Sequence, residues 1–273
     1  SIGAAQGIDV GGDVTEMTIV NSGNITATRN EDITLVAKSA TALTATSAST
    51  TSATSVGAAA AIYSQEEAEY LSVTNTASGT ITGVGKYAPA LYMRAAEQIV
   101  NNAGVINGSR QGSGPYTYGM AIGSVSDSNE VRTLDLTNSG TINGDILAVN
   151  GNAYRWSAIT AEGTLDDRLL INSNQGVLDS TISNAGTING SLFFSNGTHQ
   201  LSNANGASIT GNIDLDQRPT YATSTTTNSG GKSFTFENAG TFAGNIMVYT
   251  ATGSEATLRP TINGAGASTS TSP

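Results

Sequence analysis

The side chains of this chain that could perform chemistry are few, and their spacing limits the reactions open to them. The one histidine, His199, stands in Asn-Gly-Thr-His-Gln, and no Gly-x-Ser-x-Gly sequence surrounds any serine. Serine hydrolysis requires a nucleophile, a base and an orienting acid. We expect His199 at a loop or strand edge, without a catalytic role. The sequence therefore predicts a protein that is not an enzyme.

Carboxylates offer a second kind of chemistry. Asp214 and Asp216 would share one face of a strand, and their oxygens could hold calcium. We favour the alternative, a solvated outer face with Ile213 and Leu215 inside. The adjacent pair 166–167 would point to opposite faces of a strand, so it gives no indication of a sugar-cleaving pair. No catalytic residue and no cofactor are predicted, and calcium is the one metal considered.

Aromatic side chains gather at Tyr154 and Trp156, on either side of an arginine. Aromatic faces can stack on sugars, so the two residues are the candidate glycan contact. We favour a second role for them, that of covering a hydrophobic flank of the fold.

Composition excludes several classes of protein. The chain has 273 residues, 11 basic and 21 acidic side chains, a net charge of -10 and no cysteine. An acidic chain without a basic run is unsuited to nucleic acid or anionic lipid, and no disulfide framework is possible. No stretch is apolar enough to insert in a membrane. With 5% aromatic residues, the chain suits a thin architecture of repeated layers.

One short motif recurs along the chain, and two of its copies are Leu136–Gly144 and Ile182–Gly190. Each copy has an apolar–polar alternation, then Asn-x-Gly, then a second short apolar segment. The alternation predicts strands. Because Asn and Gly tolerate left-handed backbone conformations, we expect them to bend the chain. The predicted structural bends are Asn21, Gly23, Asn102, Gly104, Asn138, Gly140, Asn184, Gly186, Asn238 and Gly240.

The spacing of the copies favours a solenoid over hairpins. The shortest interval, from Asn184 to Asn203, is 19 residues, about one turn of a coil, and stacked copies would place Asn over Asn in an amide ladder. A third strand of the form Ala-aliphatic is expected after each motif, with a polar loop behind it, as at Glu162–Arg168. The candidates for this strand are 61–64, 90–93, 121–124 and 158–161.

The fold class is therefore all-β: a single-stranded parallel β-helix with about three short strands per turn and variable extruded loops. It is expected to occupy residues 1–263, with loop insertions near 39–60 and 222–233. Residues 264–273 are predicted to be a flexible linker.

The Asn-Ser/Ala-Gly-Thr-Ile-Asn-Gly units at 138–144 and 184–190 resemble the passenger domains of bacterial autotransporters and haemagglutinin-like secreted adhesins. The resemblance implies a right-handed coil displayed outside the bacterial cell or on its surface. It also implies adhesion or cell–cell contact, with other copies of the chain or host glycans and proteins as partners.

Two other functions fit some of the same features. A self-assembling surface layer or extracellular filament would use the ends of stacked coils. A polysaccharide-degrading enzyme is the more remote alternative, because other parallel β-helices cleave glycans with clustered carboxylates or calcium.

Overall fold

In the computed structural model, the described residues form strands and the short turns between some of them. The described residues are 7–10, 14–28, 60–64, 68–84, 89–109, 120–126, 131–150, 152–159, 165–172, 177–194, 197–216, 233–249, 261–264 and 269–270. No helix long and apolar enough to cross a membrane occurs among them. The predicted insertion at 39–60 falls outside these residues except for its last position, and the one at 222–233 falls outside them except for Ser233.

Three parallel sheets contain all but two of the described strands. Sheet A consists of β1 (Ile8–Val10), β4 (Ile62–Ser64), β7 (Leu91–Met93), β10 (Met120–Ser126), β13 (Asp145–Asn150), β18 (Leu192–Phe194), β21 (Ile213–Asp216), β24 (Ile246–Tyr249) and β26 (Thr269–Ser270). Sheet B consists of β2 (Glu16–Asn21), β5 (Tyr70–Asn75), β8 (Glu97–Asn102), β11 (Val131–Asn138), β16 (Val177–Asn184), β19 (Thr198–Asn203), β22 (Ser233–Asn238) and β25 (Thr261–Gly264). Sheet C consists of β3 (Asn24–Thr28), β6 (Thr80–Val84), β9 (Val105–Ser109), β12 (Thr141–Asn143), β17 (Thr187–Asn189), β20 (Ser208–Thr210) and β23 (Thr241–Ala243).

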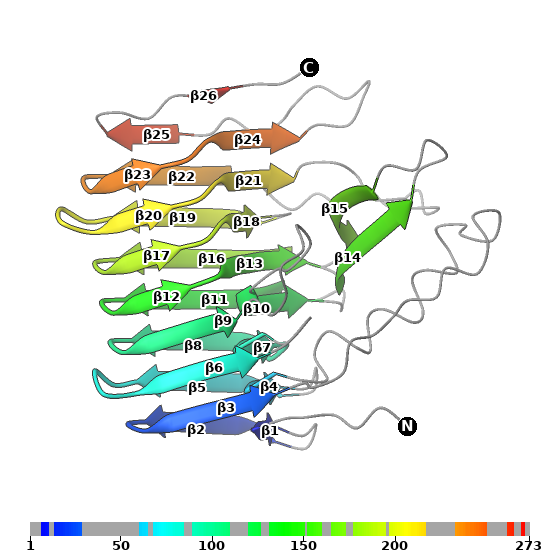
Figure 1. Ribbon diagram of the computed structural model, residues 1–273, viewed down its shortest axis with the longest axis vertical. Coiled ribbons are helices and arrows are strands. Elements are labelled where there is room, and N and C mark those ends of the chain that lie inside the picture. The colour runs from blue at the N-terminus through cyan, green and yellow to red at the C-terminus, as the bar shows by residue number, and fades with distance from the viewer. Residues whose placement is uncertain are drawn as a thin grey trace.

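The chain visits sheets A, B and C in turn, so each circuit adds one strand to each sheet (Figure 1). Strands of successive circuits pair in parallel, and equivalent motif positions face each other: Leu136 pairs with Ile182, and Ile142 with Ile188. The predicted parallel β-helix with three strands per turn is confirmed.

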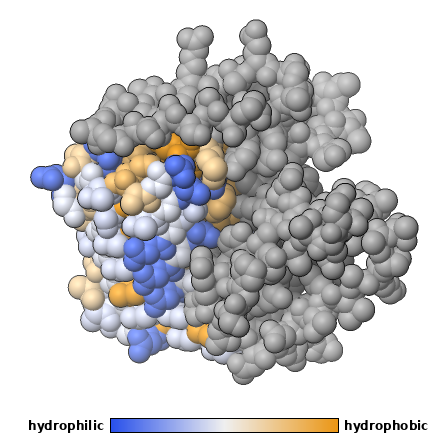
Figure 2. All heavy atoms as spheres, turned by 45° about the horizontal axis from the view of Figure 1, so that its top comes forward, coloured by the Kyte–Doolittle hydropathy of each residue, from blue (hydrophilic) through white to orange (hydrophobic). Residues whose placement is uncertain are grey.

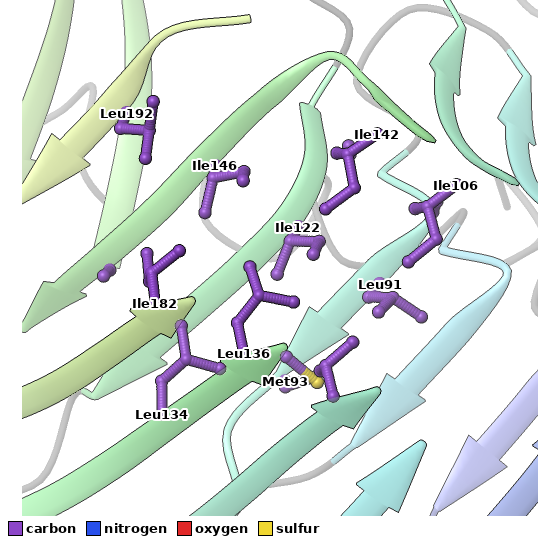
Figure 3. Packing of buried hydrophobic residues seen from close by; sticks show 14 of the residues in the cluster. Leu91, Met93, Ile106, Ile122, Leu134, Leu136, Ile142, Ile146, Ile182 and Leu192 are labelled. Carbon is purple, nitrogen blue, oxygen red and sulfur yellow. The ribbon is translucent and has the colours of Figure 1, made fainter. Parts of the chain in front are cut away.

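The core runs along the axis of the coil and is built from aliphatic columns. In β11 the side chains alternate between exposed and buried, because every second residue of a strand points inward. Residues from the three sheets meet inside (Figure 3): Leu91, Ile122, Ile146 and Leu192 from sheet A, Leu134, Leu136 and Ile182 from sheet B, and Ile106 and Ile142 from sheet C. Each fully buried Leu or Ile contributes about 1.5–3 kcal/mol to stability.

The predicted third strand is right in three coils and wrong in the fourth. The Ala-aliphatic segments at 61–64, 90–93 and 121–124 contain β4, β7 and part of β10 of sheet A. The segment at 158–161 does not join this sheet, because its first two residues end strand β14, Asn152–Ile159. The strand that does fill this position is β13, which begins directly after Gly144.

β14 forms an antiparallel hairpin with β15, Leu165–Asn172, outside the three sheets. Tyr154 pairs there with Leu170, and Trp156 with Arg168. The expected loop from Glu162 to Arg168 is therefore partly strand. The hairpin contacts β10 and β13 and stands beside the stack as a side arm (Figure 1).

The last described strands lie at the C-terminal end of the stack. β25 pairs with β22, and β26 pairs with β24 although it lies within the predicted linker at 264–273. Residues 265–268 and 271–273 of that segment lie outside the described part of the chain.

Candidate interaction face

The predicted bend asparagines form one continuous ladder inside the coil. Each Nδ2, except that of the last member, donates a hydrogen bond to the Oδ1 of the Asn in the next coil, over 2.8–2.9 Å. The ladder runs through Asn21, Asn75, Asn102, Asn138, Asn184, Asn203 and Asn238. Every member is at most 9% exposed. The same Nδ2 groups also reach backbone carbonyls at the bend, as from Asn138 to Gly140 and Thr187. The ladder therefore satisfies polar groups that water does not reach.

Glycine is required at these bends for a different reason from the predicted left-handed backbone conformation. Positive φ angles among the described glycines occur at 144, 197, 206 and 211, and not at the glycines of the predicted Asn-x-Gly bends. A Cβ on Gly140 would instead overlap the carbonyl oxygen of Gly104, and one on Gly186 would overlap that of Gly140. These positions need glycine because the backbones of successive coils come too close for a side chain.

The expectation that His199 lies at a loop or strand edge is wrong. His199 is 2% exposed and points into the core from β19, where its ring packs against Phe194 with centroids 5.0 Å apart. Its Nδ1 lies 2.8 Å from Oγ of Ser180, the residue opposite it in the neighbouring coil. The contact between Ser180 and His199 could not be predicted from the sequence, because the two residues are 19 positions apart and meet only through the register of β16 and β19.

A serine hydrogen-bonded to a histidine is one part of a serine hydrolase site. Because Ser180 is buried, labelling of its hydroxyl tests directly whether it can act as a nucleophile. We expect a fluorophosphonate reagent not to label Ser180 in the folded chain, because Ser180 is 3% exposed and no substrate can reach its hydroxyl. Intact-mass and peptide mass spectrometry would check this, with a known serine hydrolase labelled in the same tube. Stoichiometric labelling of Ser180 in the native chain would contradict the expectation.

The candidate calcium residues lie on β21. Ile213 and Leu215 are buried inside, as expected, and Asp214 points outward. The expected solvated face is wrong for Asp214, which is 8% exposed, because the outer side of sheet A is largely buried. Asp216 ends the same strand, and its side chain lies outside the described part. Among the described residues, no group of three or more His, Asp or Glu side chains could hold a metal.

The predicted glycan contact lies on the hairpin. Tyr154 and Trp156 both belong to β14 and are two residues apart, but their side chains lie outside the described part of the structure. Glycan contact at this position stays a prediction.

The outer sides of sheets A and B differ in character. On sheet A, Tyr92, Leu147 and Val149 belong to a second buried apolar cluster, and Tyr63 stacks on Tyr92 with ring centroids 5.8 Å apart. The outward side chains of sheet B are mostly Ser, Thr and acids, and its described outward positions contain no Lys or Arg. The acids there are Glu16, Glu97, Asp135, Asp179 and Glu237.

The outer side of sheet C has no charge at any described position. Each strand presents one outward residue on either side of an inward Ile or Phe, and register stacks these residues in two columns. The longer strands β3 and β6 add Thr28 and Val84, which are also uncharged. The first column is Asn24, Thr80, Val105, Thr141, Thr187, Ser208 and Thr241. The second column is Thr26, Thr82, Asn107, Asn143, Asn189, Thr210 and Ala243. We call these fourteen residues the neutral face.

Hydrogen bonds within the neutral face hold its side chains in place. Nδ2 of Asn143 donates to Oδ1 of Asn107 over 2.9 Å, and Nδ2 of Asn189 donates to Oδ1 of Asn143 over 2.9 Å. This second ladder is on the outside, where its members are half-buried or exposed. Much of the described surface in Figure 2 is pale or blue. The result is an uncharged strip of short, mostly polar side chains, in which the hydrogen bonds of the outer ladder hold Asn107, Asn143 and Asn189 in place.

The chain folds as a parallel β-solenoid. No family model, curated protein or solved structure matches it. The predicted resemblance of its repeat units to those of autotransporter passengers stays a prediction.

The sequence contained the signal for the neutral face. In Thr-Ile-Asn at 141–143 and 187–189, the isoleucine points inward and its two neighbours point outward. Because these outward positions follow each bend asparagine at nearly fixed spacing, their lack of charge can be read from the sequence.

Proposed function

We propose that this chain is a non-enzymatic extracellular surface module of a bacterium, similar to an autotransporter passenger, and that it mediates adhesion or cell–cell contact through the neutral face. The single observation that carries this proposal is an uncharged strip on a chain with a net charge of -10. Two acidic molecules repel each other, and the repulsion is weakest where neither presents a charge. Preordered short side chains also lose little entropy on contact.

The size of the neutral face sets the strength of the contact. Seven strands about 4.8 Å apart give a strip roughly 30 Å long, and two outward residues per strand give it a width of about 10 Å. The resulting area of about 300 Å² per copy is well below the roughly 800 Å² of a stable protein complex. A single pair would therefore separate quickly, while many copies on one surface would hold together by multivalency.

A bead assay tests the proposal. The chain would be coupled to beads at high density, and clustering would be followed by light microscopy. We expect beads that carry the double variant Thr141→Glu, Thr187→Glu to cluster at least about tenfold less than wild-type beads. The reason is that acids facing each other across the contact repel. The matched control is Thr137→Glu with Ser183→Glu, which places the same charges on the neighbouring sheet B positions of the same two coils. This control should change clustering little.

A complementary variant identifies the partner. Beads with Thr141→Lys and Thr187→Lys should cluster with the Glu beads if the partner is a second copy. If the partner is a host surface, wild-type beads should not cluster with each other but should bind host cells, and the sheet B control should bind equally well. Equal effects of the neutral-face and sheet B substitutions would contradict the proposal. Physiological salt should strengthen clustering relative to low salt, because it screens the net repulsion.

One feature favours the alternative, a self-assembling surface layer or filament. Among the described strands, β3 and β23 at the two ends of sheet C have a neighbour on one side only. Exposed strand edges can pair with another molecule. Electron microscopy of the soluble chain separates the two functions, because regular filaments or sheets would favour the alternative and isolated short rods would favour adhesion.

A further inference from the structure

The bend between β19 and β20 differs from the two-residue bends of its neighbours. Residues 204–207 form a turn in which Ala207 N–H donates to the carbonyl of Ala204 over 3.0 Å. Gly206, at the third position, has a φ of 85°. Asn205 and Gly206 are both exposed, and nothing lies within 4 Å of the place where a Cβ on Gly206 would be.

We infer that Asn205 is a site of spontaneous deamidation, a covalent change of the folded protein that needs no enzyme. The backbone nitrogen of Gly206 attacks Cγ of Asn205, a C–N bond forms, and the Cγ–Nδ2 bond breaks with release of ammonia. Water then opens the five-membered imide to aspartate or isoaspartate. Glycine promotes this step because it has no Cβ to block the approach and its backbone deforms readily.

Other Asn-Gly pairs of the same fold differ from Asn205-Gly206 in their hydrogen bonds. In Asn143-Gly144 and Asn189-Gly190 the attacking nitrogen is engaged, since Gly144 N–H donates to the carbonyl of Asn189 and Gly190 N–H to that of Thr210. Their Asn side chains also belong to the outer ladder. No hydrogen bond engages Gly206 N or the Asn205 side chain within the described part of the chain. The fold therefore protects the ladder pairs and leaves Asn205 reactive.

Deamidation would add a carboxylate at the corner where sheets B and C meet. It would make an already acidic chain more acidic close to the neutral face. Isoaspartate would also lengthen the backbone of this turn by one methylene. The inference does not depend on the proposed function, because it concerns the chemistry of one turn.

The test follows the intact folded chain at 37 °C in mildly alkaline buffer made with H₂¹⁸O. Asn189 and Asn205 fall in one tryptic peptide, between Arg168 and Lys232, because trypsin does not cleave the Arg218–Pro219 bond. Fragment ions therefore compare the two sites within one molecule. We expect Asn205 to react at least about tenfold faster than Asn189, because Asn189 must wait for local opening of the ladder. Each event should incorporate one ¹⁸O, and isoaspartyl methyltransferase should label part of the product.

Two controls keep the inference falsifiable. In the denatured chain the two sites should react at similar rates, because both are followed by glycine. Asn205→Gln retains an amide, but its ring closure would give a six-membered imide, which forms far more slowly, so this variant should lose the signal at position 205. Equal rates at Asn189 and Asn205 in the folded chain would overturn the inference, and so would an unchanged Asn205 under conditions in which the denatured chain reacts.

Discussion

Replacing Asn138 by alanine is expected to lower the free energy of unfolding by about 3 kcal/mol. Asn138 is 0% exposed and lies in the middle of the inner ladder. Its Nδ2 donates to Asn184 Oδ1 over 2.8 Å and to two backbone carbonyls over 3.3 Å. Its Oδ1 accepts from Asn102 Nδ2 over 2.8 Å. Alanine would leave an amide donor and carbonyl acceptors buried without these bonds, and each such loss costs about 1–3 kcal/mol.

The outer ladder supplies the matched control. Asn143 also donates to one Asn and accepts from another, but it is half-buried, so water can replace the lost bonds. Asn143→Ala should therefore cost less than about 1 kcal/mol. Urea unfolding followed by circular dichroism would measure both variants, and hydrogen exchange would show whether the loss centres on β11 and β16. Equal destabilisation by the two variants would mean that burial does not control the contribution of the ladder.

Gly140→Ala should destabilise the solenoid by about 3 kcal/mol, although it adds one methyl group. The new Cβ would overlap the carbonyl oxygen of Gly104 and also atoms of Ala103 in the preceding coil. These are backbone atoms of the bend between β8 and β9, so they cannot move aside as the end of a flexible side chain would. The two coils must separate locally, which weakens the hydrogen bonds from Ser139 and Gly140 N–H to the carbonyl of Asn102.

Gly23 occupies the same place in the first described copy of the motif and is the matched control for Gly140. Nothing lies within 4 Å of a Cβ built there, and its φ is not among the positive ones. Gly23→Ala should therefore leave stability unchanged or raise it by about 0.5 kcal/mol, because alanine restricts the unfolded chain. Thermal and urea unfolding of both variants would check this. A Gly140→Ala variant as stable as Gly23→Ala would show that the coils tolerate a wider spacing than the structure has.

The repeat alone was sufficient to predict the solenoid. A motif of two short apolar segments around Asn-x-Gly, in which Leu136 and Ile142 occupy fixed positions, requires that equivalent residues stack from coil to coil. The Asn ladder followed from this requirement and is confirmed through Asn238. Irregular insertions did not obscure the motif because they fall outside these short segments.

The errors arose where two structures share one sequence pattern. Ala158-Ile159 resembles the strands at Ala61-Ile62 and Ala90-Leu91, yet it belongs to the β14–β15 hairpin. Ile159 pairs there with Leu165, and no local sequence pattern predicts this pairing. The burial of His199 was missed for a related reason. An alternating strand has two faces, and His199, expected at a loop or strand edge, lies on the inner face, where its register partners Ser180 and Phe234 are also buried.

The inner ladder also gives the solenoid a chemical direction. Each amide donates toward the C-terminal end and accepts from the N-terminal end, so the side-chain dipoles add in one sense, as backbone dipoles do in a helix. Asn21 ends the chain of bonds with its oxygen, and Asn238 ends it with its NH₂ group, opposite Gly264 of β25. A coil that extended the ladder before Asn21 would have to bring a donor, and one that extended it after Asn238 would have to bring an acceptor. The row of buried amides thus distinguishes the two ends of the stack, as plus and minus ends distinguish a polar filament.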